Sequence, residues 1–298
     1  MRAYIATPAT IANLGPGFDI LAVAVQLQNE VRCAARDDGV VTVSAGDDMP
    51  AELRDPQRNL VTRAYAHACA AGGVSGGADF ACVNRVPFAR GLGSSAAAAL
   101  AGVLAAVALH RLPWDEQTVI DTVSQLEGHR DNAAAALLGG LAVCAPGAPA
   151  VRVDVPDRLR VIVYVPEAGL DTHAARDVVP TRFSRDDAVH NAARCALLVR
   201  ALALNDLELL GDAMEDRWHQ PARTALVPAL PALIAAARDA GAAGAALAGA
   251  GPSVVALTAE RDDDVASALQ RTADVHGVAG TVMRLAVRNF GARVDVGP

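Results

Sequence analysis

Two uncharged stretches, residues 91–109 and 240–259, limit most strongly what this chain can fold into. A segment of that length without charge either spans a membrane or lies in the core of a globular domain. Both stretches consist mainly of Ala and Gly, which favour membrane insertion only weakly, and Pro252 interrupts the second. We therefore expect the first stretch to form a buried helix in a protein that does not enter a membrane.

The composition supplies enough apolar material for such a core. The chain has 298 residues, of which 52% are hydrophobic and 20% are charged. This corresponds to one large domain or two modest ones and argues against disorder. The net charge of −7 argues against a partner with a phosphate backbone. The aromatic content of 3% leaves few side chains on which nucleic-acid bases could stack. We therefore expect no nucleic-acid partner.

The basic residues are all arginine. None of the 26 is lysine, which excludes a Walker A loop, a lysine Schiff base and a catalytic lysine. The 5 cysteines are scattered without a CxxC pair, and the 7 histidines lack the spacing of a zinc site. Because the sequence also shows no signal peptide, this pattern predicts reduced core thiols and a cytoplasmic protein without zinc.

The order of predicted strands and helices favours an α+β fold. Alternating and β-branched residues predict strands, and apolar residues at helical spacing predict helices, one of them capped by Asn59. The two types do not alternate strictly, which disfavours a doubly wound sheet. The Pro- and Gly-containing stretch 145–150 predicts a boundary between domains at 1–150 and 151–298. Strands are expected at residues 3–11, 20–27, 30–35, 40–45, 80–86, 160–165, 254–258 and 281–285, and helices at 60–71, 94–110, 113–126, 131–138, 187–204, 206–217 and 229–240.

A glycine–serine loop connects a predicted strand to the helix at 94–110. Glycines allow backbone N–H groups to approach an anion, and the first turn of a helix adds positive partial charge. The serines add hydroxyls, one for a phosphate oxygen and one for Mg²⁺. A purely structural turn is the alternative. A dinucleotide fingerprint is excluded, because residues 110–115 form a turn into a helix instead of a strand that ends in an acidic residue. The loop consists of Gly91, Leu92, Gly93, Ser94, Ser95, Ala96 and Ala97.

A second polar segment, residues 127–132 with the sequence EGHRDN, joins two predicted helices. Glu127 at the C-terminal end of a helix is unfavourably placed against the helix dipole unless a cation binds there. The alternative is a simple linker, in which Gly128 ends one helix and Asp131 or Asn132 caps the next.

Two further turns and two arginines complete the candidates. Asn13 and Asp19 flank a Leu-Gly-Pro-Gly-Phe bend that can present both side chains to one cleft, although an ordinary strand connection also fits. The Gly-Ala-Gly-Pro-Ser run at 249–253 precedes a predicted strand and equally fits a tight turn. The arginines suit bidentate binding of a carboxylate, or are solvated like most surface arginines. They are Arg176, which follows Thr172, and Arg223.

Together these segments resemble the GHMP small-molecule kinases, and within that family the branch that phosphorylates homoserine. The resemblance covers nearly the whole chain, and Arg130 departs from it at a position where Pro is common. The segments NLGPGFD at 13–19, PFARGLGSSAA at 87–97 and GAGPS at 249–253 match the family, and EGHRDN at 127–132 and THAARDVVP at 172–180 match the homoserine branch.

The resemblance implies a fold and a reaction. The fold is an N-terminal domain like domain 2 of ribosomal protein S5, a ferredoxin-like C-terminal domain and an active site between them. The reaction transfers a phosphoryl group from ATP, with Mg²⁺, to the side-chain hydroxyl of L-homoserine, and gives ADP and O-phospho-L-homoserine in threonine biosynthesis. The resemblance also implies a homodimer.

Residue roles follow from the same resemblance. The catalytic residues would be Asn132, Asn13 and Glu127, and the ligands of Mg²⁺ would be Ser95 and Glu127. ATP would contact Asn59 near its adenine and Pro87, Phe88, Ala89, Arg90, Gly91, Leu92, Gly93, Ser94, Ser95, Ala96 and Ala97 around its phosphates. The substrate would contact Asn13, Asp19, His129, Asn132, Thr172, Arg176, Arg223, Gly249 and Gly251.

The amide of Asn132 can orient an attacking hydroxyl but cannot accept its proton at neutral pH. We therefore expect phosphoryl transfer without a strong side-chain base. Two other interpretations stay open: another GHMP kinase, acting on mevalonate, a sugar or an isoprenoid precursor, and a nucleotide-binding module without turnover. Asp19 together with Arg176 and Arg223 favours an amino acid as substrate, because an acidic side chain can bind its ammonium group and arginines its carboxylate.

Overall fold

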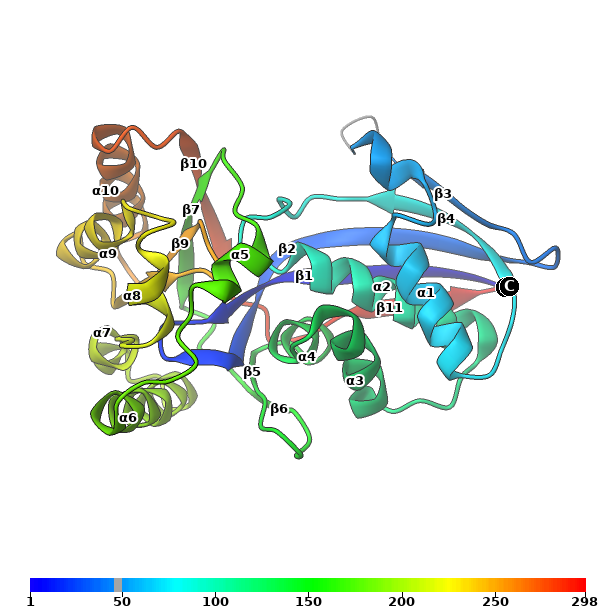
Figure 1. The fold of residues 1–298 in the computed structure, drawn as a ribbon, viewed down its shortest axis with the longest axis horizontal. Coiled ribbons are helices and arrows are strands. Elements are labelled where there is room, and N and C mark those ends of the chain that lie inside the picture. The colour runs from blue at the N-terminus through cyan, green and yellow to red at the C-terminus, as the bar shows by residue number, and fades with distance from the viewer. Residues whose placement is uncertain (46–49) are drawn as a thin grey trace.

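The computed structural model describes residues 1–45 and 50–298, whose strands form two β-sheets (Figure 1). The first sheet has a helical layer on one face, packed through a shared buried core. Its strands, in spatial order, are β11 (Arg293–Gly297), β1 (Arg2–Asn13), β2 (Gly17–Arg36), β4 (Gly77–Val83) and β3 (Val41–Ala45), and β2 also pairs with β5 (Leu141–Val143), which pairs with β6 (Val151–Val153). The helices of the layer are α1 (Leu60–Ala71), α2 (Ser94–His110), α3 (Glu116–Glu127) and α4 (Asp131–Leu138), preceded by a 3₁₀ turn at Ala51–Arg54.

The second sheet is antiparallel throughout and has the strand order expected of a ferredoxin-like unit. If the four strands are numbered by their order in the chain, they lie side by side in the order 4-1-3-2. The strands in spatial order are β10 (Gly280–Ala286), β7 (Arg160–Pro166), β9 (Val254–Thr258) and β8 (Gly244–Leu247). The helices of this part are α5 (Thr172–Asp177), α6 (Arg185–Ala203), α7 (Leu210–Ala213), α8 (His219–Arg223), α9 (Leu230–Asp239) and α10 (Asp262–Val275), with a 3₁₀ turn at Leu207–Leu209.

Helix α2 is the buried apolar helix that the sequence predicts. It is apolar on all sides, and most of its residues lie in the core between the first sheet and the neighbouring helices. Gly102 permits the close approach of α1, since a Cβ there would lie 2.1 Å from the carbonyl oxygen of Val61. None of the helices in residues 1–45 and 50–298 combines the length and the hydrophobicity that a membrane span requires.

A second buried cluster joins the two sheets. Ile11 and Val23 of the first sheet share it with Val161 and Val255 of the second. Strands β6 and β11 lie beyond residue 150 but pair within the first sheet, so both segments return to the N-terminal half. The boundary at 150 stays a prediction.

Strand β2 differs from the expected pair of strands at 20–27 and 30–35, because it runs without a break. Its register against β1 shifts between Pro8 and Ala9, where a bulge around residues 26 and 27 lets β2 continue without a break. Its first half pairs with β5 and its second half with β4, so neighbours hold the strand along its length.

The predicted helix at 206–217 is wrong beyond its first turns. Regular helix ends with α7, and the chain then turns toward α8. Here the buried carboxylate of Asp216 accepts hydrogen bonds from the backbone N–H groups of Trp218 and Gln220, which competes with continuation of the helix. The turn brings Trp218 and His219 against Phe18.

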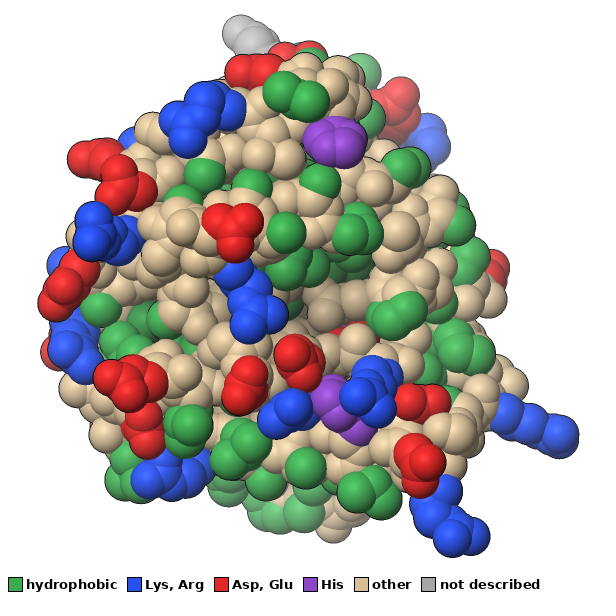
Figure 2. Space-filling view, turned by 90° about the vertical axis from the view of Figure 1, so that its left-hand side faces the viewer, with side chains coloured by type: hydrophobic (Ala, Val, Ile, Leu, Met, Phe, Trp, Pro, Cys, Tyr) green, Lys and Arg blue, Asp and Glu red, His purple; other side chains and the backbone are tan. Residues whose placement is uncertain are grey.

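Charges of both signs are mixed on the face that α6, α9 and α10 present, as Figure 2 shows. Ion pairs such as Arg200–Asp206 and Arg284–Asp263 lie in this half of the chain. This face therefore offers no extended positive field to a polyanion.

Candidate active site

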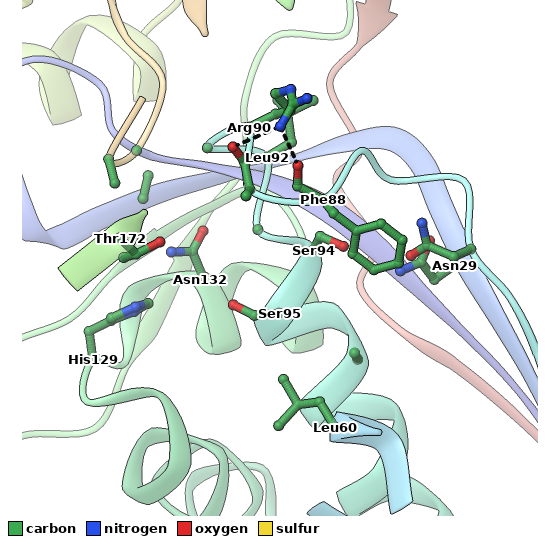
Figure 3. Close-up of a pocket in the computed structure, with 18 of the residues that line it drawn as sticks. Asn29, Leu60, Phe88, Arg90, Leu92, Ser94, Ser95, His129, Asn132 and Thr172 are labelled. Atoms are coloured by element: carbon green, nitrogen blue, oxygen red, sulfur yellow. Dashed lines mark hydrogen bonds between the residues drawn. The ribbon is translucent and has the colours of Figure 1, made fainter. Parts of the chain in front are cut away.

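A cavity of about 350 Å³ opens between the two halves of the chain, where β1 ends and α2 begins. Mainly polar side chains line one end and mainly apolar ones the other. Figure 3 shows His129, Asn132 and Thr172 near one another on the left, and Phe88, beside Asn29, and Leu60 below it on the right. The predicted site residues that line it are Asn13, Asp19, Asn59, Phe88, Ala89, Arg90, Gly91, Leu92, Gly93, Ser94, Ser95, His129, Asn132, Thr172, Arg176, Arg223 and Gly249. The predicted residues that are not in its lining are Pro87, Ala96, Ala97, Glu127 and Gly251.

The glycine–serine loop is fixed to β1 at the start of α2. The backbone N–H of Thr10 donates to the carbonyl of Leu92, 3.1 Å away. Gly93 has a φ of 68°, and a Cβ there would lie 2.0 Å from the Thr10 hydroxyl. The loop therefore holds backbone amides and the N-terminus of a long helix at the cavity, an arrangement suited to phosphate.

The two serines of the loop have different surroundings. The buried Ser94 hydroxyl donates to the carbonyl of Val86 at 3.2 Å, which serves the loop itself. The Ser95 hydroxyl instead donates to the Glu127 carboxylate, with Oγ and Oε2 2.5 Å apart. Ser95 lines the cavity, so Glu127 reaches its edge through this contact.

Ser95 and Glu127 fit a magnesium ion as two oxygen donors. Mg²⁺ usually takes one or two protein ligands and completes its shell with water and substrate phosphates. Within residues 1–45 and 50–298, no group of three or more His, Cys, Asp or Glu side chains could hold a metal. A cation would also offset the poor position of Glu127 at the C-terminal end of α3.

Arg90 faces away from the expected position of the phosphates. Its guanidinium donates to the carbonyls of Pro166, at 2.6 Å, and of Glu167 at the end of β7. The neighbouring Ala89 carbonyl accepts from the backbone N–H of Leu170. Arg90 therefore ties the loop to the segment that leads into α5.

Asn132 stands at the first turn of α4 among polar neighbours. Its Oδ1 accepts from the hydroxyl of the buried Thr10 at 2.6 Å, and its Nδ2 donates to the Asp131 carboxylate at 3.4 Å, so one hydrogen of the amide remains for a ligand. Asp131 is 1% exposed, and its carboxylate contacts Nδ1 of His129 at 2.9 Å. Burial alone would lower the pKa of His129, but the hydrogen bond and charge of Asp131, with smaller contributions from Glu127 and Asp19, raise it.

Asp19 and Arg176 form a bidentate ion pair across the cavity. The two guanidinium nitrogens lie 2.7 and 2.8 Å from the carboxylate oxygens. This hydrogen bonding raises the pKa of Arg176, against the opposing effect of burial. The Asn13 side chain positions Asp19 by accepting from its backbone N–H at 3.2 Å, and also donates to the carbonyl of Gly249 at 2.8 Å.

Arg223 is only 2% exposed and lines the same cavity. Burial lowers its pKa to about 10, and the nearby charge of Arg176 acts in the same direction. The ring of Phe18 lies 5.3 Å from the guanidinium carbon of Arg176 and 5.2 Å from that of Arg223, so one aromatic side chain orders both arginines.

Asn59 caps α1, because its Oδ1 accepts from the backbone N–H of Val61 and its Nδ2 donates to the carbonyl of Leu53. Both partners line the apolar end of the cavity together with Leu60 and Phe88. This end suits an aromatic base that is bound mainly through its faces.

The structure adds site residues that the sequence reasoning missed. Phe18 and Asp131 line the cavity and lie within the motifs at 13–19 and 127–132, so their place beside predicted site residues could have identified them. Thr10 acts through its contact with Asn132, 122 positions away, which no sequence pattern shows. His219 contacts Arg223 only four residues on, but its other partner, Gly15, is 204 positions away.

The buried His219 predicts a pH dependence of stability. Burial, with the charge of Arg223 adding to it, lowers its pKa below the usual 6.5 against the opposing charge of Asp216. A base with a lowered folded-state pKa contributes stability above pH 6.5, and this contribution is lost as pH falls toward the lowered pKa. We expect the free energy of unfolding to fall below pH 6.5 by up to about 1.4 kcal/mol per pH unit from this group. Denaturation of the wild type and of His219→Asn between pH 7 and pH 4.5 tests this, and equal slopes would contradict it.

The chain is similar to known proteins over nearly its whole length. The models of the GHMP kinases N terminal domain and of the GHMP kinases C terminal match residues 59–140 and 198–275. The chain is 39% identical to a homoserine kinase of Synechococcus sp. over 99% of this chain and 98% of the relative, and 40% identical to that of Deinococcus radiodurans over 98% and 96%.

Solved structures show the same similarity. The crystal structure of homoserine kinase from Cytophaga hutchinsonii superimposes with a TM-score of 0.88 and 29% identity, covering 99% of this chain and 97% of that one. An L. major mevalonate kinase in complex with R-mevalonate superimposes with a TM-score of 0.69 over 95% of this chain and 94% of that one, and at 19% identity this similarity shows the fold alone.

Proposed function

The chain belongs to the homoserine kinases of the GHMP kinase family, and we propose that it transfers the γ-phosphoryl group of ATP to the side-chain hydroxyl of L-homoserine. The products are ADP and O-phospho-L-homoserine. The homodimer and the cytoplasmic location belong to the same proposal.

One observation supports the substrate above all: the contact between Asp19 and Arg176 in the cavity. The ammonium and carboxylate of an α-amino acid sit on one carbon, so a site for them needs an acidic and a basic side chain side by side. Arg223 adds a second guanidinium beside the first. A mevalonate or sugar pocket has no need for this acidic partner.

The nucleotide is proposed to bind with its base at the apolar end of the cavity and its phosphates at the start of α2. Backbone amides of residues 91–95 and the positive end of the helix would neutralise the phosphates. Ser95 and Glu127 would hold Mg²⁺, which supplies positive charge to the phosphate oxygens. The hydroxyl of the substrate would then lie near Asn132, in line with the γ-phosphate.

No side chain at the reacting hydroxyl needs to act as a strong base. The Asn132 amide nitrogen would orient the hydroxyl, while its Oδ1 is already engaged by Thr10. Two carboxylates of the cavity lining also have partners, because Asp19 binds Arg176 and Asp131 binds His129. A loose transition state requires alignment and charge neutralisation more than early proton removal.

A coupled assay of ADP release tests the proposal. The purified protein is supplied with ATP and Mg²⁺ and with L-homoserine, mevalonate or galactose in turn. We expect turnover with L-homoserine alone. Turnover with one of the other acceptors would support a different GHMP kinase, and ADP release that depends on none of them would support a binding module.

Replacing Asn132 by Ala tests the orienting role. We expect kcat to fall by about 10- to 1000-fold, since a group that aligns the nucleophile acts mainly on the transition state. Steady-state kinetics with varied homoserine measure it. A variant with unchanged kcat and a raised KM for homoserine would contradict the role.

Replacing Arg176 by Lys tests carboxylate binding. Lys keeps the charge but not the planar pair of donors, so we expect the KM for homoserine to rise about 10- to 100-fold. The KM for ATP serves as the internal control and should change by less than about threefold. Equal increases in both KM values would contradict the assignment.

A further inference from the structure

Behind Arg223 lies a chain of buried polar groups that the proposed reaction does not use. The side chains of Asp216 and His219 are 0% exposed, and Arg223 is 2% exposed. His219 Nδ1 lies 3.1 Å from Nη1 of Arg223, and His219 Nε2 lies 2.6 Å from the carbonyl oxygen of Gly15. Arg223 is thereby linked, through one imidazole, to the glycine bend that follows β1.

These contacts define the protonation of His219. The carbonyl of Gly15 can only accept, so Nε2 must carry a hydrogen. The guanidinium of Arg223 can only donate, so Nδ1 must be bare. His219 is therefore neutral with its hydrogen on Nε2. The lowered pKa of this side chain also favours the neutral form.

The other groups that face this imidazole keep it in place. Asp216 Oδ2 lies 3.5 Å from Nε2 and also accepts from the backbone N–H of Gln220, which holds the start of α8. The ring of Phe18 packs on the imidazole with centroids 5.2 Å apart. Asp19 and Arg223 are the remaining charges that act on it.

The same contacts orient the guanidinium. Nε of Arg223 donates to the carbonyl of Ala175 at 2.8 Å, and Nη1 reaches both His219 and the carbonyl of Gly249, the latter at 3.2 Å. Within the described part of the chain, Nη2 makes no hydrogen bond, while Arg223 lines the cavity. The protein thus engages Nε and Nη1 of the guanidinium and leaves Nη2 for a ligand.

We propose that His219 is a positioning residue, whose unprotonated Nδ1 aims Nη2 of Arg223 at the carboxylate of the substrate. This inference rests on the proposed function. Without the Nδ1 acceptor, Nη1 would be left one hydrogen bond short in a buried site, and the guanidinium would lose its fixed orientation.

Two substitutions separate the two nitrogens of His219. In His219→Gln the amide can replace Nε2 and keep the bond to Gly15, but nothing replaces Nδ1. In His219→Asn the amide oxygen stands near the position of Nδ1 and can still accept from Arg223. We expect the KM for homoserine to rise about 10- to 100-fold in His219→Gln and less than about fivefold in His219→Asn. The KM for ATP should change by less than about threefold in both.

The matched control is His110→Gln, since His110 also hydrogen-bonds a buried side chain, the hydroxyl of Tyr65, but lies away from the cavity lining. We expect its KM values to equal those of the wild type. An unchanged KM for homoserine in His219→Gln, or equal increases in His219→Gln and His219→Asn, would overturn the proposal. A purely structural role would reduce the amount of folded enzyme without moving KM.

A second measurement does not depend on the variants folding or on activity. NMR of the ¹⁵N-histidine-labelled wild-type protein should show His219 with a hydrogen on Nε2, a bare Nδ1 and no titration between pH 8 and about pH 5.5. A hydrogen on Nδ1, or titration near pH 6.5, would overturn the proposal. If the protein shows this tautomer but does not turn over homoserine, the proposed function fails, and the positioning of Arg223 for that substrate fails with it. If the protein turns over homoserine normally but His219 has the other tautomer, only the positioning role is refuted.

Discussion

Replacing Glu127 by Gln is expected to lower kcat by about 100- to 1000-fold and to shift the Mg²⁺ dependence to higher concentration. The substitution keeps the size of the side chain and its ability to accept from Ser95, but removes the charge. If Glu127 is a ligand of the metal, the lost charge weakens binding of the ion that neutralises the phosphates. The expected loss therefore appears in kcat at limiting Mg²⁺ and is partly restored by excess Mg²⁺.

Glu116→Gln is the matched control for this experiment. Glu116 is an exposed carboxylate in the first turn of the same helix, α3, and lies outside the cavity lining. Its replacement should leave the Mg²⁺ titration of ADP release unchanged. If the Mg²⁺ titration of Glu127→Gln coincided with that of the wild type, Glu127 would not be a ligand of the metal. A similar shift in both variants would indicate a general effect of charge.

The parts of the site that the sequence predicts are those with local causes. The loop around Gly91 and Gly93 follows from glycines placed before an apolar helix, and both residues have positive φ in the structure. The polar segment before α4 is likewise local, because Gly128 ends one helix and the next begins at Asp131. Short segments of this kind carry their geometry in their own residues.

The parts that the sequence could not supply depend on distant partners. Arg90 points at β7 because carbonyls at Pro166 and Glu167 accept from it, and the sequence of the loop contains no trace of them. The contact of Thr10 with Asn132 joins residues 122 positions apart, and that of His219 with Gly15 joins residues 204 apart. Such pairs are fixed by the packing of the two halves.

The secondary structure likewise has parts that follow from local sequence and parts that depend on distant partners. Strand β8 has the sequence Gly-Ala-Ala-Leu, which has low strand propensity, and it becomes a strand by pairing with β9. Helix α8 is only 5 residues long, which is too short for a periodic pattern to reveal it. Helix α2 was predictable because its apolar character extends over its whole length.

Replacing Gly91 by Ala is expected to damage both stability and nucleotide use, because two backbone segments meet at this residue. A Cβ on Gly91 would lie 2.0 Å from the carbonyl oxygen of Ala248 and 3.1 Å from that of Gly251. Neither carbonyl is a flexible side chain, so the glycine–serine loop or residues 248–251 must move. Gly91 also has a φ of 72°, which adds about 1–2 kcal/mol for a residue with a side chain.

The chain provides a control that separates the two causes. Gly147 has a φ of 73°, but a Cβ there would meet nothing within 4 Å. Gly147→Ala should therefore cost only about 1–2 kcal/mol of unfolding free energy and leave kcat/KM for ATP unchanged. Gly91→Ala should cost about 2–3 kcal/mol more and lower kcat/KM for ATP at least about 100-fold, since the backbone amides of the loop would no longer be aligned on the phosphates. Denaturant titrations and steady-state kinetics measure both effects. If the two variants behaved alike, the close approach of the loop to residues 248–251 would have no part in holding the nucleotide.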